Sequence, residues 1–118
     1  MASTPEYTST PHVGSVVMTQ ANTNLNGSGV LYTLLLAGPN GSRVQWINFQ
    51  AASAVSAGAL RIFLNGVLFQ QISTNGTLTN YQQSYPSPTP LVLSPYDVLQ
   101  VATNNAETWD AFCLAGDF

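Results

Sequence analysis

Short runs of apolar or alternating residues, separated by Gly, Asn, Pro and Ser, cover most of the chain. Such runs, rich in Val, Ile, Leu, Phe and Thr, predict β-strands. The stretch richest in alanine, Ala51–Leu60, is interrupted by Ser53, Val55, Ser56 and Gly58, so we expect a loop or one short turn there and no helix. The predicted strands are Ser15–Gln20, Val30–Ala37, Arg43–Ala52, Ala59–Leu64, Val67–Ile72, Leu91–Leu93, Val98–Thr103 and Trp109–Ala115.

The strongest turn signal is Leu64-Asn65-Gly66-Val67, where Asn-Gly between two apolar runs supplies the positive φ angles of a type I′ hairpin. Asn26-Gly27, Asn40-Gly41 and Asn75-Gly76 are further turn signals. About eight short strands, many spaced roughly 8–12 residues apart, predict an all-β fold. We expect an antiparallel β-sandwich, of which the jelly roll is one version.

The first dozen residues carry no periodic apolar pattern, and Pro5 and Pro11 disfavour helical geometry before them. We therefore expect an extended N-terminal arm over residues 1–12 and a single β-sandwich domain over residues 13–118. The arm is either a frayed terminus or a segment that becomes ordered against an adjacent subunit. In the second case Tyr7 and His12 are its candidate contact residues.

Charge is scarce: the chain has two basic residues, Arg43 and Arg61, and five carboxylates, so 6% of residues are charged, against roughly a quarter in ordinary domains. A monomer of this size has a surface on the order of 6,000 Å², or about one charge per 900 Å². Because each partner contributes about 800 Å² to a standard interface, most patches could be covered without burying more than one charge. We expect a surface covered by neighbouring subunits, and a net charge of −3 disfavours nucleic acid.

Groups that could carry catalysis are few. The only histidine, His12, lies in the predicted arm, where a catalytic base would not be held against a nucleophile. One histidine and one cysteine, Cys113, cannot form a zinc site, and we expect Cys113 to be a buried thiol. Asp97, Glu107, Asp110 and Asp117 are expected to be solvated. We predict no enzyme activity, no metal and no cofactor.

The segment MASTPEYTSTPH has neither a basic region nor an apolar run, so we expect no signal peptide and synthesis in a cytoplasm. Apolar stretches such as Leu34–Ala37 are far shorter than the roughly 18 residues of a membrane span. We therefore expect no membrane association.

The aromatic residues allow two interpretations. Those within predicted strands favour the core; they are Trp46, Phe49, Phe63, Phe69 and Phe112. Trp109 beside Asp110 could stack on a sugar ring, or it could close the end of the sandwich, which we favour. Tyr81, Tyr85 and Tyr96 surround a proline-rich segment and are candidate subunit contacts, with packing under that loop as the alternative.

Arg43 and Arg61 flank the alanine-rich stretch. In a chain so poor in charge we expect each to pair with a carboxylate. A bidentate pair across subunits would fix their register, which makes both arginines candidate subunit contacts; a pair within the chain is the alternative.

Four motifs resemble small β-sandwich virion proteins of tailed bacteriophages. They are Gly41-Ser42-Arg43-Val44, Gly58-Ala59-Leu60-Arg61-Ile62-Phe63-Leu64-Asn65-Gly66, Asn105-Ala106-Glu107 and Gly116-Asp117-Phe118. The resemblance covers roughly residues 41 to 118. It implies a head decoration (cement) protein with no catalytic residues, located on the capsid surface of the virion.

Under this hypothesis the protein binds the major capsid protein and copies of itself, as a dimer or trimer, and stabilises the assembled head. The alternative is a glycan- or receptor-binding module of a tail fibre or spike, which requires an exposed Trp109 or Tyr cluster. A third hypothesis is another tail or connector component, which the position of the protein on intact particles would distinguish.

Overall fold

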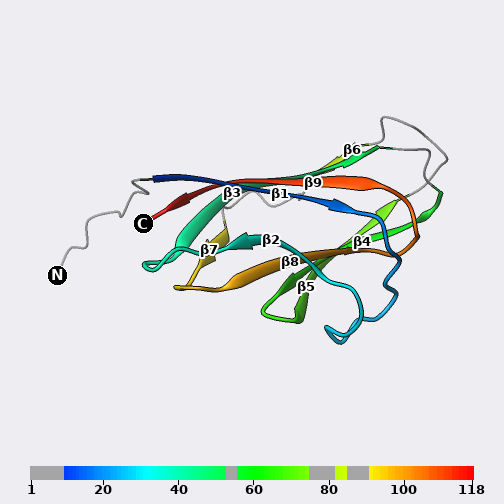
Figure 1. Ribbon diagram of the computed structural model, residues 1–118, viewed down its shortest axis with the longest axis horizontal. Helices are drawn as coiled ribbons and strands as arrows, with labels where there is room; N and C mark the ends of the chain where they lie inside the picture. Colours follow the sequence, from blue (N-terminus) through cyan, green and yellow to red (C-terminus); the bar gives the residue numbers. More distant parts are fainter. Residues whose placement is uncertain (1–9, 53–55, 75–81, 85–90) are drawn as a thin grey trace.

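A computed structural model describes residues 10–52, 56–74, 82–84 and 91–118. The described chain is a sandwich of two antiparallel sheets (Figure 1). This confirms the predicted all-β fold. The strands are β1 (Thr10–Met18), β2 (Tyr32–Leu36), β3 (Ser42–Ala51), β4 (Gly58–Leu64), β5 (Val67–Thr74), β6 (Gln82–Ser84), β7 (Leu91–Leu93), β8 (Val98–Thr103) and β9 (Trp109–Asp117).

The first sheet has the strand order β1-β9-β3-β6, with β7 also pairing with β3; the second has the order β2-β8-β4-β5. The first and last strands are paired along their whole length, from Thr10 opposite Asp117 to Met18 opposite Trp109. Strand β9 therefore lies between β1 and β3, as Figure 1 shows.

Side chains alternate between the two faces of each strand, and the inward set forms the core. In β9 the buried side chains are those of Trp109, Ala111, Cys113 and Ala115, at every second position. The core between the sheets is completed from both sides by fully buried side chains such as Met18, Ile47, Phe49, Leu60, Ile62, Leu99 and Val101. Burying each large apolar side chain contributes about 1.5–3 kcal/mol.

The predicted hairpin joins β4 to β5. Asn65 has φ 51° and Gly66 has φ 81°, the two positive angles of a type I′ turn, and Leu64 pairs with Val67. Gly27 and Gly41 of the other described Asn-Gly pairs also have positive φ, at 84° and 86°. The Asn75-Gly76 signal lies outside the described residues.

All eight predicted strands are present, with ends that differ by a few residues. Strand β6, between the tyrosines of the proline-rich segment, was missed, because Gln82–Ser84 is polar and gives no apolar signal. Strand β1 begins at Thr10, so His12 lies within the sheet and the predicted arm of residues 1–12 is wrong in its last three positions. The edge position of β1 tolerates Pro11, which lacks an amide donor.

Part of the outer face of the second sheet is covered by its own chain. Phe63 and Ala102 lie on that face and have no exposed surface. The segment 19–31 crosses over it: the Asn22 carbonyl accepts a hydrogen bond from Arg61, and Gly27 lies against the Gly66 turn.

Candidate interaction surface

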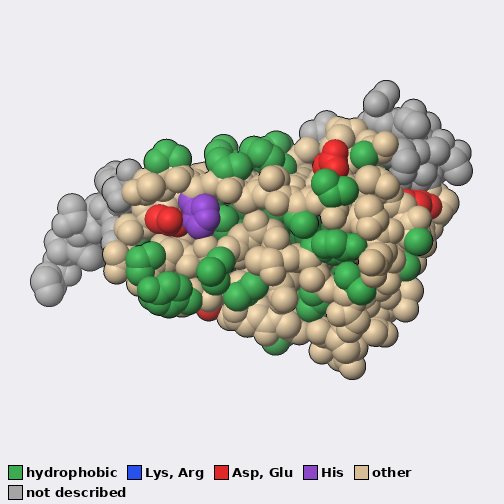
Figure 2. All heavy atoms as spheres, viewed as in Figure 1, with side chains coloured by type: hydrophobic (Ala, Val, Ile, Leu, Met, Phe, Trp, Pro, Cys, Tyr) green, Lys and Arg blue, Asp and Glu red, His purple; other side chains and the backbone are tan. Residues whose placement is uncertain are grey.

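The outer face of the first sheet carries large apolar side chains that the described chain leaves exposed. Figure 2 shows hydrophobic side chains along the upper edge, where Figure 1 places β1, β3 and β9. We call this surface the outer face. Its apolar members are Val13 and Val17 of β1, Trp46 of β3, Val92 of β7, and Phe112 and Leu114 of β9.

Strand pairing brings these residues together. Leu114 lies directly between Val13 and Trp46 on the neighbouring strands, and Phe112 lies between Ser15 and Asn48. The Trp46 and Phe112 rings meet edge to face with their centroids 5.9 Å apart. Val13, Trp46, Phe112 and Leu114 therefore form one apolar patch, and Val17 and Val92 stand at the margins of the outer face beside Asp110 and Arg43.

Trp46 reaches this face through a β-bulge. The register with β9 shifts between Val44 and Trp46, so Gln45 is the extra residue and Trp46 turns away from the core. The prediction that Trp46, Phe69 and Phe112 belong to the core is thus wrong. Phe112 points outward because its neighbours in β9 point inward, and Phe69 is partly exposed on the edge strand β5.

Two opposite charges lie on the outer face. Arg43 stands between the buried Ser42 and Val44, so its half-buried side chain faces outward next to Val92. Asp110 stands between the buried Trp109 and Ala111 and is exposed. Among the residues that the structure describes, the one ion pair joins His12 and Asp117, so the expected Arg43–carboxylate pair is not formed within the described chain.

Arg61 plays a structural part and is not a surface contact. It is buried, and its three nitrogens donate to neutral acceptors: Nε to Gln71 Oε1 at 2.9 Å, Nη1 to the Asn22 carbonyl at 3.0 Å, and Nη2 to Asn104 Oδ1 at 3.1 Å. The expectation of a carboxylate partner or subunit contact is therefore wrong for Arg61. The contacts hold the covering segment 19–31 against the second sheet.

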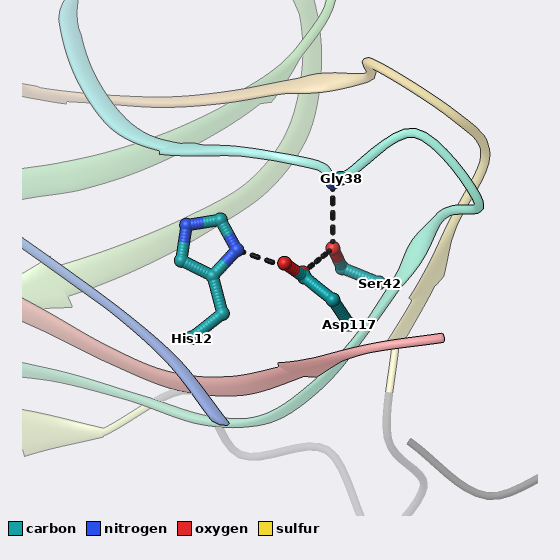
Figure 3. A network of polar contacts seen from close by, with 4 residues as sticks. All are labelled: His12, Gly38, Ser42 and Asp117. Carbon is teal, nitrogen blue, oxygen red and sulfur yellow. Dashed lines mark hydrogen bonds and ion pairs between the residues drawn. The ribbon is translucent and has the colours of Figure 1, made fainter. Parts of the chain in front are cut away.

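His12, Ser42 and Asp117 come together where β1 and β3 begin and β9 ends (Figure 3). His12 Nδ1 lies 2.8 Å from Asp117 Oδ1, and the Ser42 hydroxyl donates to the same oxygen at 2.5 Å. Ser42 Oγ in turn accepts a hydrogen bond from the Gly38 amide at 3.0 Å. The cluster joins β1, β3 and β9 to the turn after β2.

These three residue types are those of a catalytic triad, but their arrangement differs. In a triad the histidine takes the serine proton and the carboxylate orients the histidine. Here both Ser42 and His12 bind the carboxylate, and the buried hydroxyl is held by Gly38 and Asp117. This geometry gives Ser42 no base and fits a structural clasp. His12 was a candidate subunit contact, but the contact that it makes here lies within its own chain.

The pKa of Asp117 reflects that clasp. Partial burial raises it, but the hydrogen bonds from Ser42 and His12, together with the charge of the imidazolium form, outweigh burial and lower the pKa. Asp117 was expected to be simply solvated; it instead holds a network.

Trp109 is 2% exposed, so it closes the end of the sandwich and cannot stack on a sugar ring. The alternative interpretation of Trp109 and Asp110 as a glycan-stacking pair is therefore wrong for Trp109, although Asp110 beside it is exposed. Cys113 is buried as expected, and burial raises the pKa of its thiol to about 12.

Tyr96 is the one candidate tyrosine that the structure describes. It is exposed, at a φ of 62°, in the turn where the Asp97 amide donates to the Ser94 carbonyl. Pro95 before it is typical of such turns. Tyr7, Tyr81 and Tyr85 lie outside the described residues.

Sequence reasoning missed Val13, Val17, Val92 and Leu114 as surface residues. The available signal was alternation: in Trp109–Ala115 a small or buried residue at every second position leaves Phe112 and Leu114 on the opposite side. Phe112 and Leu114 are both apolar, so β9 is apolar on both faces. Only one face of a sheet packs against the core of a two-sheet sandwich, so the other apolar face is on the surface.

No pocket is found in the described part of the chain. The described ranges also hold no group of three or more His, Cys, Asp or Glu side chains that could bind a metal. No helix within those ranges has the length and apolar character to cross a membrane. What the described residues do provide is a sheet face with exposed apolar side chains at its middle.

In comparisons with known proteins, no family model matches the chain, and no curated protein matches it significantly.

Proposed function

We propose that this protein is a non-enzymatic structural component of a bacteriophage virion, a head decoration protein whose outer face is buried on assembly. The observation that carries the proposal is the contrast between the two sheets. Segment 19–31 crosses part of the outer face of the second sheet, where Phe63 and Ala102 are buried and Leu36 and Phe69 remain exposed, whereas the first sheet leaves six large apolar side chains exposed on one face. A patch of this kind marks an interaction surface.

The strand order supports the same class. Both β6 and β7 pair with β3, so they can be counted as two halves of one strand. Each sheet then has four strand positions. Counted so, the order matches that of a jelly roll, a fold that viral capsid domains use. The four motifs that resemble phage virion proteins support the assignment to a phage virion, and the position on the head is part of the proposal.

The mechanism is linkage between binding and assembly. A protein that binds the assembled shell but not its separated subunits stabilises the shell by mass action. Many symmetry-related copies make modest contacts collectively strong. A nearly uncharged surface suits this role because few ions lose their hydration when the surface is covered.

Co-sedimentation tests the proposal. Purified protein is mixed with expanded heads of the parent phage from which the protein is absent, and the heads are pelleted. We expect the protein to pellet to a saturating ratio and to raise the temperature at which the heads dissociate. A protein that stays in the supernatant at every concentration would contradict the proposal.

Leu114→Asp places a charge in the middle of the outer face and is expected to reduce the pelleted fraction. Thr33→Asp, at an exposed position of β2 in the other sheet, is the matched control and is expected to bind like the wild type.

A further inference from the structure

The pairing of strands arranges the outer face in four rows that cross the sheet. The second row is Val13, Leu114 and Trp46, and the third is Ser15, Phe112 and Asn48. The first row contains Gly116, Arg43 and Val92, and the fourth contains Val17, Asp110 and Gln50. Apolar side chains thus dominate the two middle rows. The positive charge of Arg43 stands in the first row and the negative charge of Asp110 in the fourth.

We propose, building on the proposed assembly role, that a second copy of this chain occupies the outer face, related by a twofold axis. The axis lies in the interface, roughly across the strands, between the second and third rows. A twofold interface must be self-complementary, so each row meets its counterpart in the partner: the first meets the fourth, and the second meets the third.

Charge complementarity carries this choice of partner. The axis places Arg43 of each copy near Asp110 of the other, which gives two equivalent pairs. Positions 110 and 116 of β9 are about 20 Å apart at roughly 3.4 Å per residue, so the two charges cannot pair within one chain. Arg43 is opposite Gly116 and one strand away from Asp110, an offset of about 4.8 Å that a long arginine side chain spans.

The apolar middle matches itself in the same arrangement. Leu114 of one copy lies over Phe112 of the other, and Trp46 lies over Asn48, one strand away from that Phe112. Two sheets packed face to face are about 10 Å apart, the spacing that interdigitating side chains of this size fill. The two aromatic pairs come together at the centre, where the strongest contacts of an interface normally lie.

The available area is of the right order. A face nine residues long and four strands wide measures roughly 30 by 19 Å, on the order of 600 Å². With the relief of the side chains added, this approaches the roughly 800 Å² per partner of a standard interface. A surface elsewhere on the dimer is then left for the capsid, and Leu114→Asp weakens head binding because it breaks up the dimer, which binds the head through two copies at once.

Sedimentation velocity over a wide concentration range tests the inference. The wild type is expected to sediment as a dimer of 12.5 kDa chains. Arg43→Asp sets two carboxylates against each other at both ends and is expected to raise the dimer dissociation constant at least tenfold. Asp110→Arg is expected to do the same. The double variant Arg43→Asp with Asp110→Arg exchanges the charges, keeps the net charge, and is expected to restore dimerisation.

Thr33→Asp on the other sheet is the control for added charge and is expected to leave the dimer unchanged. A wild-type monomer at millimolar concentration would overturn the inference. So would a dimer that is insensitive to Arg43→Asp, or a double variant that fails to recover, because each means that another partner or another surface is used. Near-ultraviolet circular dichroism shows that each variant is folded.

The two proposals fail in different ways. A monomer that still co-sediments with heads refutes the self-association and leaves the decoration role standing. A dimer with the predicted charge dependence that does not bind heads refutes the decoration role and leaves the interface standing.

Discussion

His12 and Asp117 join the beginning of the first strand to the end of the last: His12 Nδ1 lies 2.8 Å from Asp117 Oδ1. The same carboxylate oxygen accepts a hydrogen bond from Ser42 of β3. One carboxylate therefore ties three neighbouring strands together at their ends. Gly38 permits this, because a Cβ there would lie 2.9–3.2 Å from the atoms of the carboxylate.

This clasp predicts a pH dependence of stability. The pKa of Asp117 is lowered in the folded protein from 3.8, so the clasp stabilises the fold above that value and its contribution is lost as the pH falls through the folded pKa. Asp117→Asn is expected to reduce the free energy of unfolding by about 1 kcal/mol near neutral pH. In urea unfolding the difference between the two proteins should shrink towards pH 3; a difference that stays constant would contradict the clasp. Ser42→Ala removes a hydrogen bond that lowers this pKa, so the carboxyl should titrate at higher pH by NMR.

Arg61 is predicted to be the most important charged residue for stability. Arg61→Ala leaves acceptors of Gln71, Asn22 and Asn104 without their donor and should lower the free energy of unfolding by about 2–4 kcal/mol. Arg43→Ala is the matched control and should change it by less than about 0.5 kcal/mol in dilute protein, where the monomer predominates. Urea unfolding followed by circular dichroism measures both. Equal effects would mean that the Arg61 network does not hold segment 19–31.

Substitution by alanine is predicted to destabilise the protein by different amounts at Gly66 and Gly14, for different physical reasons. At Gly66 a Cβ would touch nothing, so Gly66→Ala should cost about 1 kcal/mol from the positive φ alone. At Gly14 a Cβ would lie 2.0 Å from the Leu34 carbonyl oxygen, where β1 of one sheet approaches β2 of the other. Gly14→Ala must separate the sheets and should cost at least about 2–3 kcal/mol. Thermal unfolding ranks the two variants, and a Gly14→Ala protein as stable as Gly66→Ala would contradict this close approach.

Local patterns predicted much of the fold. The Asn65-Gly66 turn and the strands around it follow from the chemistry of two residues and their apolar neighbours, so the hairpin was predicted closely. The start of β1 was not, because Thr10–His12 has no apolar pattern and is held by pairing with residues 115–117 at the far end of the chain. Contacts over such a sequence distance leave no local signal.

The candidate surface was predictable only in general terms. Scarcity of charge indicated a surface to be covered, but it could not say which one. Trp46 was assigned to the core because it lies within a strand-like run. Only the bulge at Gln45, which leaves no local signal, turns it to the outer face. Arg61 was expected to need a carboxylate, yet tertiary folding supplies three neutral oxygens instead.

The exposure of Trp46 tests most directly whether the outer face is buried by protein. The two tryptophans differ sharply, Trp46 being 38% exposed and Trp109 2%. With 5-fluorotryptophan incorporated, each gives one ¹⁹F resonance, and Trp46→Phe identifies the first. We predict that the Trp46 resonance shows a solvent isotope shift between H₂O and D₂O in dilute protein and loses it as concentration rises, while that of Trp109 shows none throughout. A Trp46 resonance that keeps its full solvent shift at the highest concentration, and on intact particles as well, would contradict the account.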